Sequence, residues 1–446
     1  MKRARHRRAS AARRLAPIFL AALALTGCNS EDPDPRSQIG PNPDLPPIEQ
    51  YLLAPMHIAK VVGWKEGEKP TVPPGLQVQA LATGLEHPRS LHVLPNGDVL
   101  VIESRAPDLH PIRRPKDLIM GWVESMATSS GESKGSNRIT LLRMNDAGAV
   151  QTRSVFLDHL SSPFGAALVG NDIYVADTDA ILRYPYTPGD TQMTKPATTL
   201  TPLPGGPIDH HWTKDLVASK DGSLLYVGIG SNSNITENGI EAEKDRAAIW
   251  EVDRASGRFR VFASGLRNPN GLSFEPQTGA LWAVVNERDE LGPNLVPDYL
   301  TSVKENGFYG WPYSYYGQHV DPRVMPQRPD LVASAIVPDY ALSSHVAPLG
   351  LVFYTGTNLP ENFRGGAFVG EHGSWNRKTL NGYKVVYIPF QDGHPNGMAQ
   401  DVVTGFLNSD GQARGRPVGL AVDRTGALLI ADDVGNTVWR VSAAAK

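Results

Sequence analysis

The chain has very little cysteine: Cys28 is the single cysteine among 446 residues. One thiol excludes disulfides within the chain, and it excludes zinc or iron–sulfur sites built from several cysteines. The position of Cys28 close to the N-terminus fits an exported, anchored protein better than a cytosolic one.

Long helical patterns are also missing. From Gly75 onward no segment keeps the apolar period of an amphipathic helix, whereas the chain holds 43 glycines and 37 prolines. Such a composition favours tight turns and short strands. The charged fraction of 20% and the hydrophobic fraction of 41% still allow one large core.

The first residues lack acids. No Asp or Glu precedes Glu31, seven Lys or Arg residues lie between Lys2 and Arg14, and the apolar run from Leu15 to Leu25 is too short to span a bilayer. The following residues, LTGC, resemble a bacterial lipobox. We therefore expect residues 1–27 to be a lipoprotein signal peptide and Cys28 to be lipidated, with plain signal-peptide cleavage as the alternative. The expected location is the periplasmic side of the envelope, anchored to the outer membrane.

Charge disfavours one class of partner. The formal net charge is -3, and removal of the seven cations of the signal peptide moves it to about -10 (-3 - 7), which disfavours nucleic acid. Prolines are frequent in residues 28–74, and this segment is predicted to be an extended tether.

A short phrase returns along the rest of the chain: a corner that usually holds proline, alternating apolar residues, a turn and a second apolar strand. It occurs six times, as PRSLHVLPNGDVLVIE from Pro88, PFGAALVGNDIYVAD from Pro163, WTKDLVASKDGSLLYVGIG from Trp212, PNGLSFEPQTGALWAVVNE from Pro269, PLGLVFYTGTNLPENFRGGAFVGEH from Pro348 and PVGLAVDRTGALLIADD from Pro417. Repeats of this kind predict an all-β fold, a six-bladed β-propeller over residues 75–446.

Turns and closure support this fold. Asn96-Gly97, Asp221-Gly222, Thr278-Gly279 and Thr425-Gly426 stand between paired strands, where a hairpin needs residues that tolerate a positive φ. Residues 77–82, QVQALA, precede the first phrase and are predicted to pair with the last blade. A β-sandwich or a multi-sheet α+β protein is the alternative.

Loops of a propeller converge at one end of its channel, so polar residues at equivalent points of the phrases are expected to form a ring. The corners supply His210, His211, Arg267, Asn268 and Arg416, and the strand ends supply Glu103, Asp177, Asn286, Glu287, Glu371, His372, Asp432 and Asp433. This ring offers a general base, cations for an anionic ligand, and oxygen ligands for a hard cation.

Three types of residue carry this chemistry. His210 and His211 are base candidates, because imidazole titrates near ambient pH. Two arginines, Arg267 and Arg416, suit a carboxylate-bearing ligand or a developing oxyanion, with salt bridges to Glu287 or Asp433 as the alternative. Aromatic residues of the stretch GFYGWPYSYY, Trp311 among them, are suited to stack on a flat ligand or to fill the core.

At this point the residues resemble a known family. GLRNPNGL followed by GFYGWPYSYYG is similar to the soluble pyrroloquinoline quinone (PQQ)-dependent sugar dehydrogenases. The segments NERDELG, VPDYLTSV, GEHGSWNR and RPVGLAVD resemble the L-sorbosone dehydrogenase-like branch, and the resemblance extends over residues 75–441. The resemblance implies a six-bladed propeller that holds PQQ over the channel, with calcium on the quinone side.

The resemblance also implies residue roles. His211, from HWTKDL, becomes the base that takes the proton of the sugar hydroxyl. Arg267 and Asn268 contact the cofactor, and Arg267 also assists the quinone. The remaining cofactor contacts fall on Arg416, Asp433, His372, Arg377 and Trp311, where His372, Arg377 or Lys378 takes the place of a family lysine.

Calcium falls on the turn after the acidic strand end, Glu287, Asp289 and Glu290. The glucose-oxidising members have Gly-Pro there, so its ligands in this chain are carbonyls or carboxylates. A family glutamine is replaced by Phe164-Gly165, and a second arginine by Val418.

Three functions follow. The first is a PQQ-dependent oxidoreductase that oxidises an aldose or a sorbosone-like sugar aldehyde and passes electrons to a quinone or a cytochrome. The second is a six-bladed lactonase with calcium as Lewis acid, which uses the same carboxylates and histidine without Arg267 or Arg416. The third is a non-catalytic binding propeller.

Overall fold

The computed structural model describes residues 34–51, 56–107, 136–145 and 148–444. The predicted signal peptide, residues 1–27, and the lipidation site Cys28 lie outside these residues. Within the described ranges no helix is long and apolar enough to cross a membrane.

Six antiparallel sheets of four blade strands build the fold, which confirms the predicted six-bladed propeller. The first three blades are β3 (Pro88–Val93), β4 (Val99–Glu103), β5 (Arg138–Met144) and β6 (Val150–Leu157); β7 (Gly165–Val169), β8 (Asp172–Ala176), β9 (Ala180–Pro185) and β10 (Thr198–Pro202); and β11 (Leu216–Ala218), β12 (Leu224–Ile229), β13 (Ala248–Asp253) and β14 (Phe259–Ser264).

The last three blades follow the same order from the inside outward. They are β15 (Pro269–Phe274), β16 (Leu281–Val285), β17 (Pro297–Ser302) and β20 (Tyr340–Ser344); β21 (Pro348–Phe353), β22 (Ala367–Glu371), β23 (Lys384–Ile388) and β26 (Gln400–Val403); and β27 (Pro417–Val422), β28 (Leu428–Asp432), β29 (Thr437–Ala443) and β2 (Leu76–Ala82).

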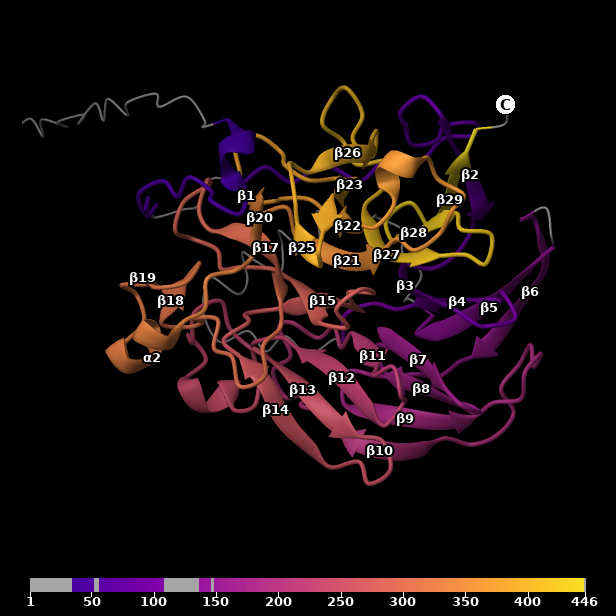
Figure 1. Ribbon diagram of the computed structural model, residues 1–446, viewed down its shortest axis with the longest axis horizontal. Coiled ribbons are helices and arrows are strands. Elements are labelled where there is room, and N and C mark those ends of the chain that lie inside the picture. The colour runs from indigo at the N-terminus through magenta and orange to yellow at the C-terminus, as the bar shows by residue number, and fades with distance from the viewer. Residues whose placement is uncertain (1–33, 52–55, 108–135, 146–147, 445–446) are drawn as a thin grey trace, which may run out of the picture. The chain divides into compact units, whose positions relative to one another are not determined.

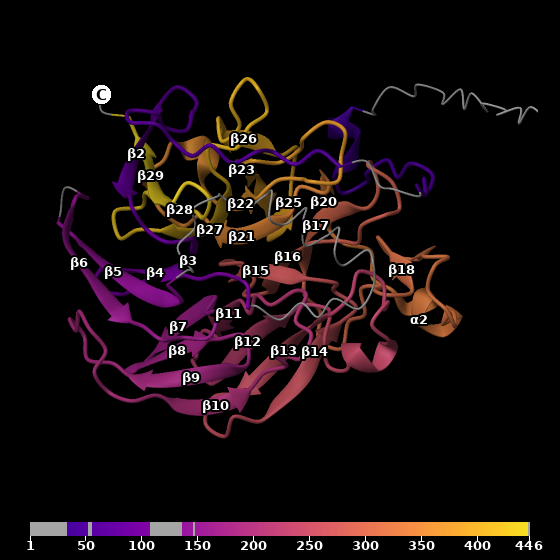
Figure 2. The ribbon, with the colours of Figure 1, turned by 180° about the vertical axis from the view of Figure 1, so that it is seen from behind.

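Short elements decorate the blades. They are η1 (Pro35–Gln38), β1 (Ile39–Gly40), η2 (Ile240–Glu243), β18 (Ser314–Tyr315), β19 (His319–Val320), α2 (Pro329–Ser334), η3 (Glu361–Phe363), β24 (Phe390–Gln391) and β25 (His394–Pro395). Figure 2 shows β18 and α2 beside the blades, in an insertion between the third and fourth strands of blade 4.

The innermost strands form a ring. Each contacts the next, in the order β3, β7, β11, β15, β21, β27 and back to β3, and Figure 1 shows them around a common centre. The ring is closed by β2, which pairs antiparallel with β29, with Val78 opposite Val441. The predicted pairing of residues 77–82 with the last blade is therefore confirmed.

Glycine permits the close approach of neighbouring inner strands. Four corners read Pro-x-Gly, and a Cβ added to the glycine of blade 5, Gly350, would lie 2.1 Å from the carbonyl oxygen of Val418 in blade 6. At Gly165 in blade 2 it would lie 2.3 Å from the amide nitrogen of Leu216 in blade 3. The repeated glycine is thus a packing requirement of the ring. The predicted turn glycines, such as Gly97 (φ 90°) and Gly426 (φ 84°), do adopt positive φ.

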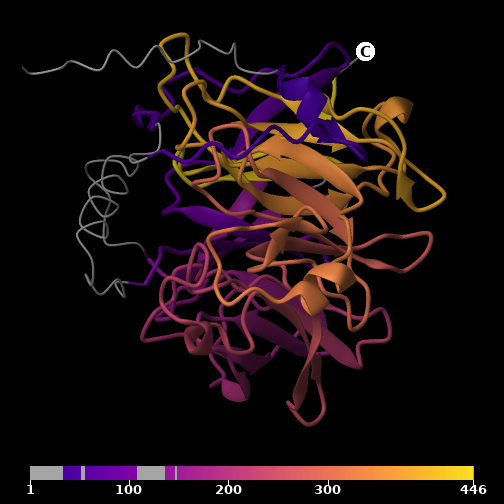
Figure 3. The same ribbon diagram turned by 90° about the vertical axis from the view of Figure 1, so that its left-hand side faces the viewer.

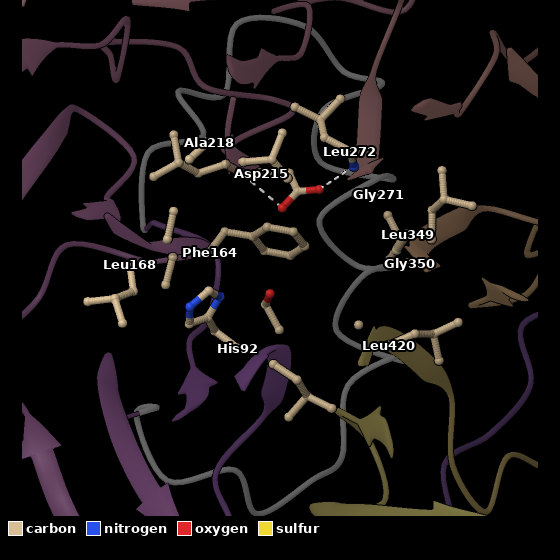
Figure 4. A pocket seen from close by; sticks show the side chains of 18 residues that line it. His92, Phe164, Leu168, Asp215, Ala218, Gly271, Leu272, Leu349, Gly350 and Leu420 are labelled. Atoms are coloured by element: carbon tan, nitrogen blue, oxygen red, sulfur yellow. Dashed lines mark hydrogen bonds between the residues drawn. The ribbon is translucent and has the colours of Figure 1, made fainter. Parts of the chain in front are cut away.

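The channel inside the ring is closed partway along by apolar side chains. Phe164, Trp212, Leu349 and Val418 come from four different blades and pack together. Beside them lies a cavity of about 300 Å³ lined by all six inner strands. Figure 4 shows His92, Phe164 and Asp215 around it. Burial lowers the pKa of His92 to about 4 and raises that of Asp215 to about 6.

The described part of the segment predicted to be an extended tether lies against the ring. Residues 34–51 and 56–74, here called the strap, pack against the propeller. The strand β1 extends the sheet of blade 4 by pairing with β20, and Figure 3 shows this indigo segment against the orange strands. The Gln38 side chain is buried and donates to the carbonyl of Asn294 at 2.5 Å.

Further along the strap, the indole N–H of Trp64 donates to Asp432 at 2.7 Å. The prolines do keep the strap extended, but an extended backbone is also free to bond to a neighbour, as the amide of Glu49 does with the carbonyl of Leu291 at 2.8 Å. The described part of the strap is therefore a component of the fold.

One buried carboxyl in blade 5 makes stability depend on pH. Burial raises the pKa of Glu371 from 4.5 to about 8, so the folded chain keeps a proton that the unfolded chain loses. The stabilisation from this group is complete below pH 4.5 and is lost as pH rises toward 8.

We expect Glu371→Gln to weaken the decline of the melting temperature between pH 6 and pH 9, because an amide has no proton to lose. Thermal unfolding followed by circular dichroism measures it. The exposed Glu361→Gln in the same blade is the control and should decline like the wild type. Equal slopes for all three proteins would contradict an elevated pKa for Glu371.

Candidate active site at the mouth of the channel

The mouth is the end of the channel at which the inner strands begin, because there the corners of all six phrases meet. It holds two clusters of polar side chains. The blade-4 cluster comprises Asn234, Arg267, Asn268, Asp289 and Trp311. The blade-6 cluster comprises Arg89, His372, Arg416 and Asp433.

Asn234 organises the blade-4 cluster. Its side-chain oxygen accepts from Arg267 Nη2 at 3.0 Å and from the Asp289 amide at 2.9 Å. Its backbone carbonyl accepts from Trp311 Nε1 at 2.9 Å and from Arg267 Nε at 3.3 Å. This residue lies in the long loop after β12, SNSNITENG, whose polar sequence carried no motif that pointed to the site.

Arg267 is buried, and each of its three guanidinium nitrogens donates to an acceptor in the protein. It also donates to the carbonyl of Glu287 at 2.6 Å and forms an ion pair with Asp289 at 3.1 Å. Arg267 therefore pairs with Asp289, and it reaches Glu287, one of the two partners named in the salt-bridge alternative, only at the backbone carbonyl. Asn268 is different, because its buried side-chain oxygen has no hydrogen-bond partner among the described residues.

Trp311 is buried, and its indole N–H is used to hold Asn234. Its observed role is to anchor this loop of blade 3. It thereby fixes the backbone to which Arg267 is bonded.

His211 presents one ring nitrogen for chemistry. Its Nδ1 lies 2.8 Å from the carbonyl oxygen of Ser231, which requires the proton to be on Nδ1 and leaves the lone pair on Nε2. Burial, with Arg267 and His210 nearby, lowers the pKa of His211 well below 6.5. The ring is thus neutral at ordinary pH, which is the state a general base requires.

The blade-6 cluster is built around Asp433. This buried carboxylate accepts from Arg89 Nη1 at 2.6 Å and from His372 Nε2 at 3.0 Å. Burial opposes its ionisation, but His372 and Arg89 together bring the pKa of Asp433 well below its ordinary value. Arg89 was not predicted, although it stands in the corner of the first phrase as Arg267 and Arg416 stand in theirs.

Arg416 is the cation with the fewest protein partners in the two clusters. Its Nε and Nη2 are buried and have no hydrogen-bond partner among the described residues, and its guanidinium carbon lies 5.1 Å from the centre of the Tyr383 ring. The Nε of Arg89 is likewise buried without a partner within the described chain. Unsatisfied buried cations are costly in an empty protein and suit an anionic ligand.

Trp212 joins the two clusters. It follows His211 in the chain, and the guanidinium of Arg89 lies 5.5 Å from its ring centre. Phe164, which replaces the family glutamine, packs edge-on against the same ring at 6.2 Å. The mouth therefore has an apolar floor with a base on one side and two arginines on the other.

Arg377 lies beside the mouth in a structural setting. It is buried, and it donates to the carbonyl of Ser344 at 3.3 Å and to the side chain of Asn294 at 2.8 Å. These bonds tie the loop of blade 5 to blade 4. The sequence alone did not separate this arginine from Arg416.

The predicted calcium ligands diverge. The carboxylate of Glu287 accepts from Arg288 at 2.9 Å, and that of Asp289 accepts from Arg267 and, at 2.6 Å, from Asn376. Glu290 takes a left-handed backbone conformation (φ 72°). Across the described ranges no three His, Cys, Asp or Glu side chains are grouped as for a metal.

Each of the first two carboxylates is neutralised by its own arginine, so the three side chains do not surround one point. The backbone carbonyls of this turn also have protein donors: that of Glu287 accepts from Arg267 at 2.6 Å, and that of Asp289 accepts from Asn234 Nδ2 at 3.1 Å and from Arg323 Nη1 at 3.0 Å. The same loop continues to Gly292-Pro293, where the carbonyl of Gly292 lies 3.1 Å from His345 Nε2.

Comparison with known proteins shows the family to which the chain belongs. The family described as Glucose / Sorbosone dehydrogenase matches residues 85–387, and a TrAA12-like family matches residues 331–444. Since the first match covers more than half of the chain, this protein belongs to the glucose/sorbosone dehydrogenase family.

Two relatives illustrate the family. The aldose sugar dehydrogenase YliI of Escherichia coli is 22% identical over 331 residues, 70% of this chain and 81% of that protein. An uncharacterized protein of Borreliella burgdorferi is 31% identical over 249 residues, 54% of this chain and 62% of that protein. The match thus spans less than two thirds of the length of the second relative.

A solved structure supports the fold. The holo form of the pyranose dehydrogenase PQQ domain from Coprinopsis cinerea superposes with a TM-score of 0.67 and 20% identity. The match covers 86% of this chain and all of that one. At this identity the likeness concerns the fold.

The hydrogen bonds of Asn234 can be tested by mutation. We expect Asn234→Ala to lower the free energy of unfolding by about 1.5 to 3 kcal/mol, because it removes the side-chain oxygen that accepts from Nη2 of the buried Arg267 and from the amide of Asp289. Denaturant unfolding measures the change. Asn396→Ala removes an exposed amide and should have little effect. An equal decrease of the free energy of unfolding in both variants would show that the hydrogen bonds of Asn234 do not stabilise the fold.

Proposed function

We propose that this protein is a PQQ-dependent dehydrogenase that oxidises an aldose or a sorbosone-like sugar aldehyde. The observation that carries the proposal is the unsatisfied side-chain nitrogens of the buried Arg416 and the partly buried Arg89, across the apolar floor from the neutral His211. PQQ bears three carboxylates on a flat ring system. Such a ligand would satisfy both guanidinium groups and lie on the Trp212 and Phe164 floor.

The residues of the mouth would have different roles. Arg416 and Arg89 would hold carboxylates of the cofactor, and the free oxygen of Asn268 would accept a hydrogen bond from it. When bound, PQQ supplies the acceptor for a hydride from the sugar carbon. His211 would take the hydroxyl proton at Nε2, while the carbonyl of Ser231 keeps the ring oriented through Nδ1.

Arg267 would act mainly by holding the loops around the mouth in position. Its bonds to Asn234, Glu287 and Asp289 fix the loops around the mouth, and its charge helps to keep His211 neutral. The turn after β16 does not fit a calcium ion as it stands, because the carboxylates and the carbonyls of Glu287 and Asp289 all accept from protein donors. The lactonase alternative needs carboxylates around one cation, and the diverging Glu287 and Asp289 give it no support.

The cell-envelope setting belongs to the same proposal. The basic, apolar start and the LTGC sequence support export and lipidation at Cys28, with the propeller on the periplasmic side of the outer membrane. Electrons would then leave to a quinone or a cytochrome.

The base is tested through turnover. We expect His211→Ala to reduce sugar-dependent dye reduction by about a hundred to ten thousand fold, because proton removal is lost, while PQQ still binds. Stopped assays with aldoses and sugar aldehydes measure it. His159→Ala, at a side chain 92% exposed, is the control. Unchanged turnover in His211→Ala, or no sugar oxidation by wild-type protein loaded with PQQ and calcium, would refute the proposal.

The cofactor contact is tested by binding. We expect Arg416→Met to weaken PQQ binding about 10- to 100-fold, because one charge-assisted hydrogen-bonding group is removed. Spectral titration of the cofactor-free protein measures the dissociation constant. Arg183→Met, at an exposed ion pair on blade 2, should bind PQQ like the wild type. Equal affinity in both variants would place PQQ elsewhere.

A further inference from the structure

Three buried charged side chains of blade 3 belong to neither cluster of the mouth. Asp209, Lys214 and Arg246 are 0%, 0% and 6% exposed. Asp209 Oδ1 accepts from Arg246 Nη2 at 2.9 Å, and Lys214 Nζ lies 3.4 Å from both oxygens of the same carboxylate. We call these three residues the blade-3 ion cluster.

The charges of the blade-3 ion cluster are costly to bury. Two cations face one carboxylate, which also accepts from the hydroxyl of Thr178. Burial lowers the pKa of Lys214 to about 8, so this side chain is still charged at neutral pH. Buried ion pairs stabilise a fold no better than well-packed apolar residues of the same size. Stability alone therefore gives only a weak reason for this cluster.

The cluster holds the segment that carries His211. Asp209 precedes His211 by two residues, and Lys214 follows it by three. Lys214 Nζ also donates to the carbonyl of Trp212 at 2.8 Å. The two ends of this short segment are thus joined by a salt bridge, with His211 between them.

Arg246 holds the segment that carries the hydrogen-bond partner of His211. Its Nη1 donates to the carbonyl of Gly230 at 2.9 Å, and Gly230 directly precedes Ser231. A Cβ added to Gly230 would lie 2.4 Å from the Cβ of His211, so the two segments are in close contact. One carboxylate therefore connects, through Lys214 and Arg246, both segments between which the bond of His211 runs.

That bond selects the tautomer of His211. Its Nδ1 lies 2.8 Å from the carbonyl oxygen of Ser231 and 3.0 Å from the Ser231 hydroxyl oxygen. The Ser231 hydroxyl donates its proton to the carbonyl of Ser233 at 2.7 Å, so both oxygens of Ser231 accept from His211. A shift of either segment would weaken these bonds and allow the ring to carry its proton on Nε2.

We propose that the blade-3 ion cluster positions His211 and its acceptor Ser231, and thereby keeps Nε2 free for proton transfer. This inference rests on the proposed function, in which His211 takes the hydroxyl proton of the sugar. Asp209, Lys214 and Arg246 are positioning residues, because they act through the backbone of Trp212 and Gly230. The positive charge of Arg246 also contributes to the low pKa of His211.

The tautomer is tested first, in the full-length protein without PQQ. Lys214→Met and Arg246→Met each leave one cation opposite Asp209, so the remaining charges balance. We expect the separation between the nitrogen-15 chemical shifts of Nδ1 and Nε2 of His211 to shrink by about a quarter or more in each variant, because the ring then samples both tautomers. Nuclear magnetic resonance of protein with labelled histidine measures these shifts, and the spectrum of His211→Gln assigns them.

Arg254→Met is the matched control for this experiment. Arg254 belongs to the same blade and donates to the carbonyl of Gly222, at the end of the blade away from the mouth. Its variant should keep the wild-type signals of His211. Should a cluster variant fail to fold, Thr178→Val replaces it, because it removes only the hydroxyl that donates to Asp209, and a smaller change in the same direction is expected.

Two results of the tautomer experiment would overturn the proposal. The first is a wild-type ring with its proton on Nε2. The second is a wild-type spectrum of His211 in the folded cluster variants, because the cluster would then only stabilise blade 3, even if the variants melt at a lower temperature.

Turnover then separates this inference from the proposed function. With PQQ and an aldose, we expect Lys214→Met and Arg246→Met to lower kcat by about tenfold and to leave KM and the dissociation constant of PQQ within about twofold of the wild type, because only the base is displaced. An unchanged kcat in both variants, or an equal loss in Arg254→Met, would overturn the positioning role. Absence of sugar oxidation by the wild type would refute the proposed function, and the tautomer experiment would still decide whether the cluster positions His211.

Discussion

Everything at the mouth depends on the close packing of six inner strands, held in a ring by the pairing of β2 with β29. A blade alone has two exposed faces, and only a closed ring buries both faces of every blade. The approach of neighbouring inner strands is so tight that Gly350 and Gly165 leave no room for a Cβ. This tightness sets the corners of the phrases close together, and the corners carry the arginines and the histidine.

Charge within the mouth is distributed unevenly. Asp289 and Asp433 each accept a guanidinium, so Arg267 and Arg89 are largely neutralised from within the protein. Arg416 bonds its backbone amide to Asp432 but leaves two side-chain nitrogens unsatisfied. An uncompensated buried cation lowers stability, and its retention at one point of the ring marks the place where an anion contributes most.

The sequence allowed the fold to be predicted well, because each phrase carries its turn glycine, its corner and its alternating strand, and because local signals suffice for hairpins. It allowed His211, Arg267 and Arg416 to be singled out as corner residues. It did not show that Arg377, in the loop between β22 and β23, bonds to Ser344 and Asn294, whereas Arg416, at the corner before β27, keeps unsatisfied nitrogens, because this difference depends on residues distant in sequence. Asn234 was missed because an asparagine in a polar loop carries no spacing signal, and Arg89 was missed although it stands at the corner of the first phrase.

The acidic turn shows a second limit of prediction from the sequence. Glu287 and Asp289 are close in sequence, but the direction of each carboxylate depends on its arginine partner, which is the adjacent Arg288 for Glu287 and Arg267, at the corner before β15, for Asp289. The strap shows a third. Proline-rich composition predicts an extended backbone, yet whether that segment is solvated or packed depends on acceptors far along the chain, such as the carbonyl of Asn294 for the Gln38 side chain and Asp432 for the Trp64 indole.

The strap also determines how the molecule would bear mechanical load. A pull on the chain ahead of Asp34 would reach β1 and the buried Gln38 first, and only afterwards Trp64 and the closing strand β2. The hydrogen bonds of β1 to blade 4 would be loaded before those between β2 and β29. The strap would thus bear a force applied to the N-terminal side before that force reaches the pairing of β2 with β29, which closes the ring.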